Sequence, residues 1–229
     1  MSGGSVSRAV FGVAGVLLLS RVLGFLREVV IAHRFGTSAE YDLYLVAIMF
    51  SALAYGIFNY AGYYLFVPYL TRKLQAAQAR GAPNFWPLVN SGASAAAITA
   101  VVLVLAAPEL LRFWTVGFLE AEYARVVFYS RVTAVAVVLG VGEAFMRAFL
   151  NVKRIYTYPA FGYIVFNLFS IGSIVMFADT LGVSAIALGW IGGLLVQNIY
   201  LGVRLAGVHR FGGYRAQVFT EETKFLVTT

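Results

Sequence analysis

The sequence contains no cysteine, only two histidines and few charged residues of either sign. The absence of cysteine excludes disulfide bonds and thiolate metal ligands from these 229 residues. The two histidines, His33 and His209, are too far apart in the sequence to suggest a shared site. Charged residues make up 12% of the chain, whereas a typical soluble domain has about 25%. A soluble globular protein is excluded, because too little polar surface remains to cover it.

Signatures of catalysis and of nucleotide binding are also lacking. The sequence has no Ser/His/Asp set and no metal-ligand spacing, and Gly189, Gly192 and Gly193 lie in an apolar segment rather than at a strand-to-helix turn. The sequence therefore predicts a protein that is not an enzyme and that uses no cofactor and no metal. The formal net charge of +7 does not indicate nucleic acid, because the basic residues lie in short loops between apolar segments.

Long apolar segments dominate what is present, with hydrophobic residues at 61%. Segments of about 20 or more apolar residues are long enough to cross a bilayer core of about 30 Å as helices. The sequence predicts an all-α polytopic membrane protein with one six-helix lobe over residues 1–208. Residues 209–229 are predicted to be a cytoplasmic linker that could begin a further helix. The six predicted spans are residues 5–33, 41–71, 85–112, 123–150, 157–180 and 183–207.

Basic residues concentrate on one side of the predicted membrane. With a cytoplasmic N-terminus, the outer side holds only Arg34, Arg112 and Arg125 among the basic loop residues. Because cytoplasmic loops carry the excess of Lys and Arg, this bias predicts that both ends of the six-helix unit are cytoplasmic. The basic residues on the inner side are Arg8, Arg72, Lys73, Arg80, Lys153, Arg154, Arg204, Arg210 and Arg215.

The first predicted span carries charges that are costly in a membrane, namely Arg21, Arg27 and Glu28. Arg21 and Glu28 are seven residues apart and lie nearly on one helix face, and Arg27 lies about a third of a turn around it. This pattern is typical of a helix that lines a hydrated, cationic cavity, and arginine suits phosphate or carboxylate ligands. The alternative is that the charges form ion pairs that only support the architecture.

A second charged set lies in the fourth predicted span: Arg131, Glu143 and Arg147. Glu143 and Arg147 are four residues apart and could pair on adjacent helical turns. They are equally compatible with a structural pair and with a role in ligand binding or proton coupling. Asn59 and Asn167 are predicted to form hydrogen bonds between helices, with substrate contact as the alternative.

Several motifs resemble the MviN/MurJ lipid II flippases, which belong to the multidrug/oligosaccharidyl-lipid/polysaccharide exporter superfamily. The resemblance rests on the segments 20–28 (SRVLGFLRE), 35–42 (FGTSAEYD) and 66–68 (FVP), with Leu150-Asn151, Pro159-Ala160 and Asn167 further along the chain. It implies two six-helix lobes around a central cationic cavity in the bacterial inner membrane. It also implies alternating access, which moves an undecaprenyl-pyrophosphate-linked saccharide from the inner to the outer leaflet.

By position, the resemblance implies that Arg21 and Arg27 hold the pyrophosphate and that Glu28 and Asp42 tune or gate that site. The chain departs from the family pattern in its second span, where Tyr55 and Gly56 stand in place of the usual arginine pair. The resemblance covers one lobe, so the expected partners are the lipid-linked glycan, the bilayer and a second lobe or a second copy of this chain. Two other functions stay open: a non-transporting scaffold of cell-wall assembly, and a lobe of a multidrug cation antiporter.

Overall fold

The computed structural model describes the backbone of residues 3–80 and 84–208, and the side chains of residues 11–76 and 84–208. These residues are helical apart from short turns, which confirms the predicted all-α class. The predicted linker of residues 209–229 lies outside the described residues, as do the side chains of Arg8 and Arg80. The helices are α1 (Gly3–Phe35), α2 (Ala39–Arg80), α3 (Trp86–Arg112), α4 (Glu120–Thr133), α5 (Val135–Val152), α6 (Thr157–Leu181) and α7 (Ser184–Val208).

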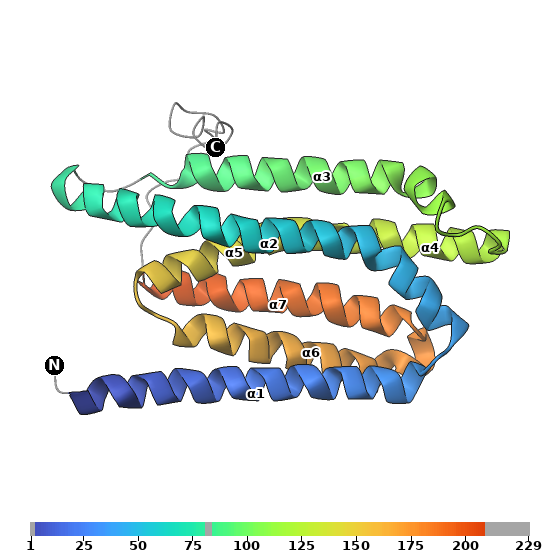
Figure 1. Cartoon of the computed structure of the whole chain (residues 1–229), viewed down its shortest axis with the longest axis horizontal. Coiled ribbons are helices and arrows are strands. Elements are labelled where there is room, and N and C mark those ends of the chain that lie inside the picture. Colours follow the sequence, from blue (N-terminus) through green and yellow to red (C-terminus); the bar gives the residue numbers. More distant parts are fainter. Residues whose placement is uncertain (1–2, 81–83, 209–229) are drawn as a thin grey trace.

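The helices run side by side in an up-and-down bundle, with α1 and α2 on opposite sides of α6 and α7 (Figure 1). α1 packs on α6, α6 packs on α7, and α7 packs on α5. α5 in turn packs on α2 and α3, and α4 lies against the same two helices. The short connection at residues 36–38 joins α1 to α2, and the two helices diverge from it. This divergence leaves room between α1 and α2 over the surface of α6 and α7.

The predicted fourth span is one membrane-length unit that bends at Ala134, where α4 ends and α5 begins. The hydroxyl of Thr133 lies 2.8 Å from the Tyr129 carbonyl oxygen and 3.1 Å from the Ser51 hydroxyl. Serine and threonine hydroxyls that bond back to their own helix compete with the backbone ladder and bend it. The six predicted spans therefore correspond to seven helical segments.

Five helical units in the described residues are long and apolar enough to cross a membrane. They are Ala39–Ala76, Trp86–Arg112, Glu120–Val152, Thr157–Leu181 and Ser184–Val208. α1 is not among the five, because its described part includes Arg21, Arg27, Glu28 and Arg34. The chain is thus a multi-pass membrane protein, and the crossing of α1 stays a prediction.

Charge separates between the two ends of the bundle. Helix ends and turns at one end carry Arg72, Lys73, Lys153, Arg154 and Arg204. The other end holds most of the acidic residues of the described chain, namely Glu40, Asp42, Glu109, Glu120, Glu122 and Asp179. Two ion pairs join helices at this acidic end: Arg34 with Asp179 at 2.7 Å and Arg125 with Glu40 at 2.9 Å. The cytoplasmic location of the basic end stays a prediction.

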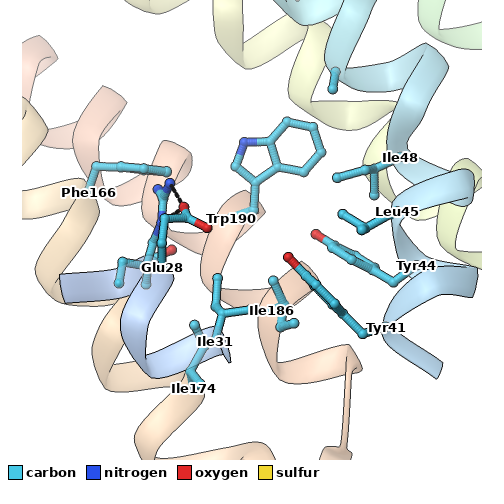
Figure 2. A pocket seen from close by; sticks show the side chains of 13 residues that line it. Glu28, Ile31, Tyr41, Tyr44, Leu45, Ile48, Phe166, Ile174, Ile186 and Trp190 are labelled. Carbon is cyan, nitrogen blue, oxygen red and sulfur yellow. Dashed lines mark hydrogen bonds and ion pairs between the residues drawn. The ribbon is translucent and has the colours of Figure 1, made fainter. Parts of the chain in front are cut away.

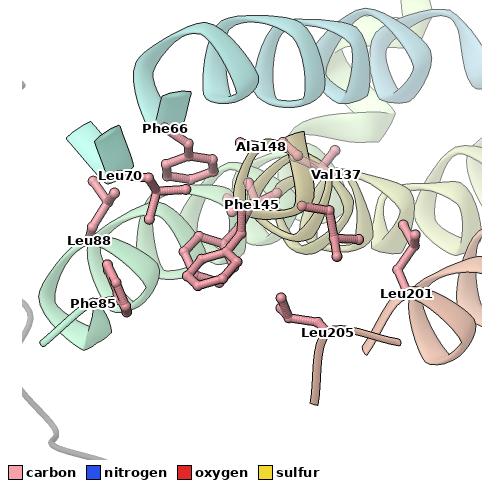
Figure 3. Close-up of a cluster of buried hydrophobic side chains, with 14 of the residues drawn as sticks. Phe66, Leu70, Phe85, Leu88, Val137, Phe145, Ala148, Leu201 and Leu205 are labelled. Carbon is pink, nitrogen blue, oxygen red and sulfur yellow. The ribbon is translucent and has the colours of Figure 1, made fainter. Parts of the chain in front are cut away.

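The largest buried cluster packs α2, α3, α5 and α7 together near the basic end (Figure 3). Aromatic rings meet edge to face in it, with Phe66 and Phe145 at 5.7 Å and Phe85 and Phe149 at 5.4 Å between ring centroids. Such pairs add about 0.5–1.5 kcal/mol beyond the area that they bury. Phe66 of the FVP motif is therefore a core residue that fixes α2 on α5. The other residues labelled in Figure 3 are Leu70, Leu88, Val137, Ala148, Leu201 and Leu205.

Glycines of α7 allow α6 and α7 to approach closely. A Cβ atom on Gly193 would lie 2.9 Å from the Phe166 ring and 3.1 Å from the Phe166 carbonyl oxygen. A Cβ atom on Gly189 would lie 3.1 Å from the Ser170 carbonyl oxygen. Small residues at such contacts let helix backbones meet in a membrane.

We expect Gly193→Ala to lower the stability of the bundle by about 1–3 kcal/mol, because the added methyl group overpacks the α6–α7 contact. The measurement is the thermal unfolding midpoint of the purified protein in detergent. Gly172→Ala on α6 is the control, since a Cβ atom there meets nothing within 4 Å. That control should gain up to about 1 kcal/mol from helix propensity. Equal midpoints for the two variants would contradict the close contact.

Candidate functional site

The charged part of α1 faces α6 through Arg27. Its Nε and Nη2 atoms donate to Glu28 Oε1 at 3.1 and 2.6 Å, and its Nη1 atom donates to Asn167 Oδ1 at 3.4 Å. The guanidinium also lies over the Phe166 ring, 5.3 Å from its centroid. The side chain of Arg27 is 25% exposed and that of Glu28 is 56% exposed. The pair is thus accessible from outside the bundle, while α6 holds its positive member in place.

Asn167 is the residue of α6 that positions this part of α1. Its Nδ2 atom donates to the carbonyl oxygens of Ser20 on α1 at 3.2 Å and of Tyr163 on α6 at 2.9 Å. Gly24 of α1 lies beside it, and a Cβ atom there would be in ordinary contact with Asn167 Oδ1 at 3.8 Å. The hydrogen bond between helices that the sequence predicts for Asn167 is confirmed.

The outer face of α1 is apolar and exposed, as the helical pattern predicts. The residues opposite the charges are Val22, Phe25, Leu26 and Val29, which are 45–69% exposed. In a membrane this side faces lipid or another protein. Of the charged residues of this sector, Arg27 therefore faces the bundle, while Arg21 and Glu28 are exposed.

A partly open cavity of about 280 Å³ lies between α1, α2, α6 and α7, beside the Arg27–Glu28 pair (Figure 2). Arg27 and Glu28 form its charged wall. The opposite wall is aromatic, with Tyr41 and Tyr44 on α2 and Trp190 on α7. Phe166 and Ser170 of α6 line it as well, and its apolar part includes Ile31, Ile174 and Ile186. This combination of one charged pair and several aromatic faces suits a ligand that is both anionic and ringed.

Packing below the cavity holds its walls in position. Ile31, Tyr44, Ile174 and Ile186 belong to one buried cluster that joins α1, α2, α6 and α7. Tyr44 is 2% exposed as a residue and packs edge to face on Tyr129 of α4, with 5.8 Å between the ring centroids. The aromatic wall is thus part of the folded core rather than a loose surface.

Two of the residues predicted for this site lie elsewhere. Arg21 is exposed on α1 and does not line the cavity. Asp42 is exposed in the first turn of α2, and its neighbour Tyr41 lines the cavity instead. The structure therefore brings together Arg27 and Glu28 of the predicted set and leaves Arg21 and Asp42 outside the cavity wall.

The aromatic wall was not part of the predicted site. Tyr41, Tyr44 and Ile48 recur at spacings of three and four along α2, and this periodicity could have indicated a shared face. Trp190 gives no comparable signal, because the other aromatic residue of its glycine-rich apolar helix is Tyr200, ten residues further on. Its place in the cavity depends on how α7 packs against α6, and its ring contacts Tyr55 of α2 edge to face.

Glu143 and Arg147 lie close together in a buried polar cluster between α2, α5 and α6, which we call the α5 cluster. Arg147 Nη1 lies 3.6 Å from Glu143 Oε1, and the side chains are 13% and 1% exposed. Glu143 Oε2 accepts hydrogen bonds from Tyr55 Oη and Asn59 Nδ2, both at 2.9 Å. Arg147 donates to Tyr163 Oη and, at 3.0 Å, to Asn59 Oδ1. The cluster also includes Tyr63, whose ring lies 4.7 Å below the Arg147 guanidinium.

Arg131 lies apart from this cluster. It is exposed on α4, and its Nε atom donates to the Val104 carbonyl oxygen of α3 at 3.2 Å. Val104 lies four residues before Pro108, which has no N–H to offer that carbonyl. Arg131 thus satisfies the acceptor that the proline leaves free, which is a structural role. In the described part of the chain, no group of three or more His, Cys, Asp or Glu side chains could hold a metal ion.

Comparison with known proteins gives a consistent result. The family model of the lipid II flippase MurJ matches residues 31–226. The match begins three residues after Glu28 of α1. "Probable lipid II flippase MurJ" of Aquifex aeolicus is 27% identical over 191 residues, which cover 81% of this chain and 38% of that protein. The protein of the same name from Rhizobium tropici is 29% identical over 233 residues, which cover 94% of this chain and 42% of that protein.

The chain therefore spans about two fifths of the length of these curated relatives. The family match extends from the end of α1 through α7 and includes every helix that forms the aromatic wall of the cavity. Because this match covers far more than half of the chain, the protein belongs to the lipid II flippase MurJ family.

Proposed function

We propose that this chain forms a membrane lobe that binds the head group of an undecaprenyl-pyrophosphate-linked saccharide, such as lipid II, in the cavity beside Arg27. The lobe takes part in moving that lipid from the inner to the outer leaflet of the bacterial inner membrane by alternating access. The observation that carries the proposal is the partly exposed Arg27 guanidinium on the wall of a cavity within a bundle of apolar helices. Family membership supports a lipid-linked substrate.

The contacts of Arg27 explain how an anion would bind. Two of its nitrogen atoms donate to one oxygen of Glu28, as they would to a diphosphate oxygen. Glu28 is more than half exposed, and ion pairs of this kind contribute only about 0–1 kcal/mol. A diphosphate can therefore displace Glu28, which is the counter-ion of Arg27. The bond to Asn167 is kept, so the arginine stays in position when its partner changes.

The aromatic wall suits the saccharide. The faces of a pyranose ring carry C–H groups that pack on flat aromatic rings, and Tyr and Trp also offer polar edges. The volume of about 280 Å³ lies at the lower limit of small-molecule pockets, which span about 300–1,000 Å³. The cavity thus accommodates part of the head group, and a second lobe or a second copy of this chain would enclose the rest.

Orientation follows from the charge separation. The basic end of the bundle would face the cytoplasm, since Lys and Arg favour the cytoplasmic side and contact anionic lipid there. Arg27 and the cavity then lie toward the outer half of the membrane, near the connection between α1 and α2. This lobe would accordingly hold the head group late in its passage to the outer leaflet.

Arg27→Gln should weaken the binding of geranyl pyrophosphate, a water-soluble prenyl diphosphate, by about 10- to 150-fold. The expected loss is that of one charge-assisted hydrogen-bond partner, about 1.5–3 kcal/mol. Glu28→Gln should have the opposite effect and tighten binding about 2- to 5-fold, because it removes the competing carboxylate. Arg21→Gln should weaken the binding of geranyl pyrophosphate less than Arg27→Gln does, because Arg21 lies outside the cavity. Titration calorimetry of the protein in nanodiscs measures all three.

Arg125→Gln is the matched control, since Arg125 pairs with Glu40 at the acidic end of the bundle. Vesicles with a fluorescent lipid-linked saccharide extend the test to transport, alone and with a second lobe supplied. Equal affinities for Arg27→Gln and Arg125→Gln would overturn the site. Normal binding without protein-dependent flipping would favour a scaffold, and preferred binding of organic cations would favour an antiporter.

Trp190→Leu tests the saccharide part of the cavity separately. We expect about 3- to 10-fold weaker binding of undecaprenyl pyrophosphate that carries a saccharide, and unchanged binding of undecaprenyl pyrophosphate without one, because only the sugar contacts the aromatic wall. Competition with a labelled lipid in nanodiscs measures both affinities. Trp114→Leu is the control, because Trp114 is exposed in the α3–α4 connection. Equal losses for both lipids would place the saccharide elsewhere.

A further inference from the structure

The α5 cluster contains a carboxylate that the proposed transport site does not use. Glu143 is 1% exposed and lies within a membrane-spanning unit, nine residues before its end at Val152. Its Oε2 atom accepts two hydrogen bonds, but its Oε1 atom is buried and has no hydrogen-bond partner. A buried charge in a membrane is costly, and such residues mark ion and proton pathways. The unpaired oxygen therefore needs an explanation.

Arg147 balances the charge of Glu143 without forming a hydrogen bond to it. The 3.6 Å between Arg147 Nη1 and Glu143 Oε1 is too long for one. The Nη1 and Nη2 atoms of Arg147 donate instead to Tyr163 and Asn59, and its buried Nε atom has no partner. A proton can consequently be added to Glu143 Oε1 without breaking any hydrogen bond of the α5 cluster. The carboxylic acid would keep both bonds at Oε2.

In the described part of the chain, Arg147 is the only charged side chain that contacts Glu143. The titratable groups that face it are Tyr55 from α2 and Tyr163 from α6, and Tyr63 of α2 lies against Arg147. α7 contributes the uncharged Asn198, which lies against Gly142. α3 has its described charges, Glu109 and Arg112, at its far end, and Arg131 of α4 is bonded to Val104. Protonation of Glu143 would thus change the α5 cluster from neutral to a net charge of +1.

The α5 cluster is joined to the cavity through one helix. On α6, Tyr163 accepts a hydrogen bond from Arg147, and Asn167 accepts one from Arg27. Asn167 also donates to the Tyr163 carbonyl oxygen, so the two residues are successive turns of one face, about 6 Å apart along the helix. Protonation of Glu143 leaves the charge of Arg147 unbalanced, and Arg147 is linked to the anion that Arg27 would hold through adjacent turns of α6. Interactions between charges extend over such distances in a medium of low dielectric constant.

We propose that Glu143 is a proton-binding site and that it takes up a proton when an anionic head group binds in the cavity. The proton is transferred from hydronium: an O–H bond of the hydronium breaks and leaves water, an O–H bond forms at Oε1, and no hydrogen bond of the α5 cluster is lost. The anion favours the cluster with a charge of +1, and by linkage a lower pH favours binding of the anion. The inference rests on the proposed function, because it names the ion that is bound together with the head group.

The test counts protons directly. Titration calorimetry of the whole chain in nanodiscs with geranyl pyrophosphate, repeated in buffers of different ionisation enthalpy, gives the protons taken up per ligand across a pH series. We expect the wild-type protein to take up as much as one proton more than Glu143→Gln near the pH of greatest uptake. The affinity of wild type should rise about 5- to 150-fold as the pH falls, the usual range of coupling between sites. Glu143→Gln should bind tightly at all pH values.

Glu109→Gln is the matched control, because Glu109 is an exposed carboxylate of α3 that does not line the cavity. Protonation of the ligand itself is common to all variants and cancels in their differences. Tyr55→Phe keeps the ring and removes one hydrogen bond to Glu143, and it should shift the pH of greatest uptake. It serves as the second variant if Glu143→Gln loses its monodisperse, helical state.

The outcomes separate the two proposals. Wild-type uptake that exceeds that of Glu143→Gln, with Glu109→Gln unchanged, supports a proton site at Glu143. Binding of the ligand with equal uptake in wild type and in both cluster variants overturns this inference and leaves the proposed function standing. Uptake that disappears only in Glu28→Gln overturns it as well and assigns the proton to the cavity wall. A wild-type protein that does not bind the ligand at any pH overturns both proposals.

Discussion

The cost of a charge in a membrane-spanning helix determines how α1, α2, α5 and α6 pack together. Glu143 and Arg147 are buried only because Tyr55, Asn59 and Tyr163 supply their hydrogen bonds from two other helices. Each helix that approaches α5 therefore does so at a fixed height and rotation, since a shift of one turn would leave a buried ion unsatisfied. The phenylalanine-rich cluster near the basic end buries further apolar area. Apolar packing alone would tolerate a shift of one turn more easily.

The ion pairs Arg27–Glu28 on α1 and Glu143–Arg147 on α5 have different consequences because their exposure differs. In the pair on α1, the carboxylate of Glu28 is 56% exposed and water can replace its contact to Arg27. In the pair on α5, the carboxylate of Glu143 is 1% exposed and water has no comparable access. The first pair can exchange its partner for a ligand, whereas the second changes its charge only through a proton. α6 contacts both pairs and is the element through which one affects the other.

Periodicity within a single helix was a reliable guide to this structure. It predicted the charged sector of α1 and the pairing of Glu143 with Arg147. It could not predict which residues of different helices meet, because that depends on the rotation and height of each helix. Trp190 joined the cavity and Asp42 did not for this reason. The bend at Ala134 arises from hydroxyls of two helices, and hydropathy does not register such contacts.

The departure of α2 from its family pattern acquires a physical meaning once α5 is considered. The resemblance implies an arginine pair in the second span, where this chain has Tyr55 and Gly56. Arg147 of α5 places a guanidinium against that same stretch of α2, with hydrogen bonds to both the side chain and the backbone of Asn59. Positive charge thus reaches this part of the bundle from a neighbouring helix instead of from α2 itself. The carboxylate of Glu143 lies four residues from Arg147, so the net charge of the pair depends on whether Glu143 is ionised.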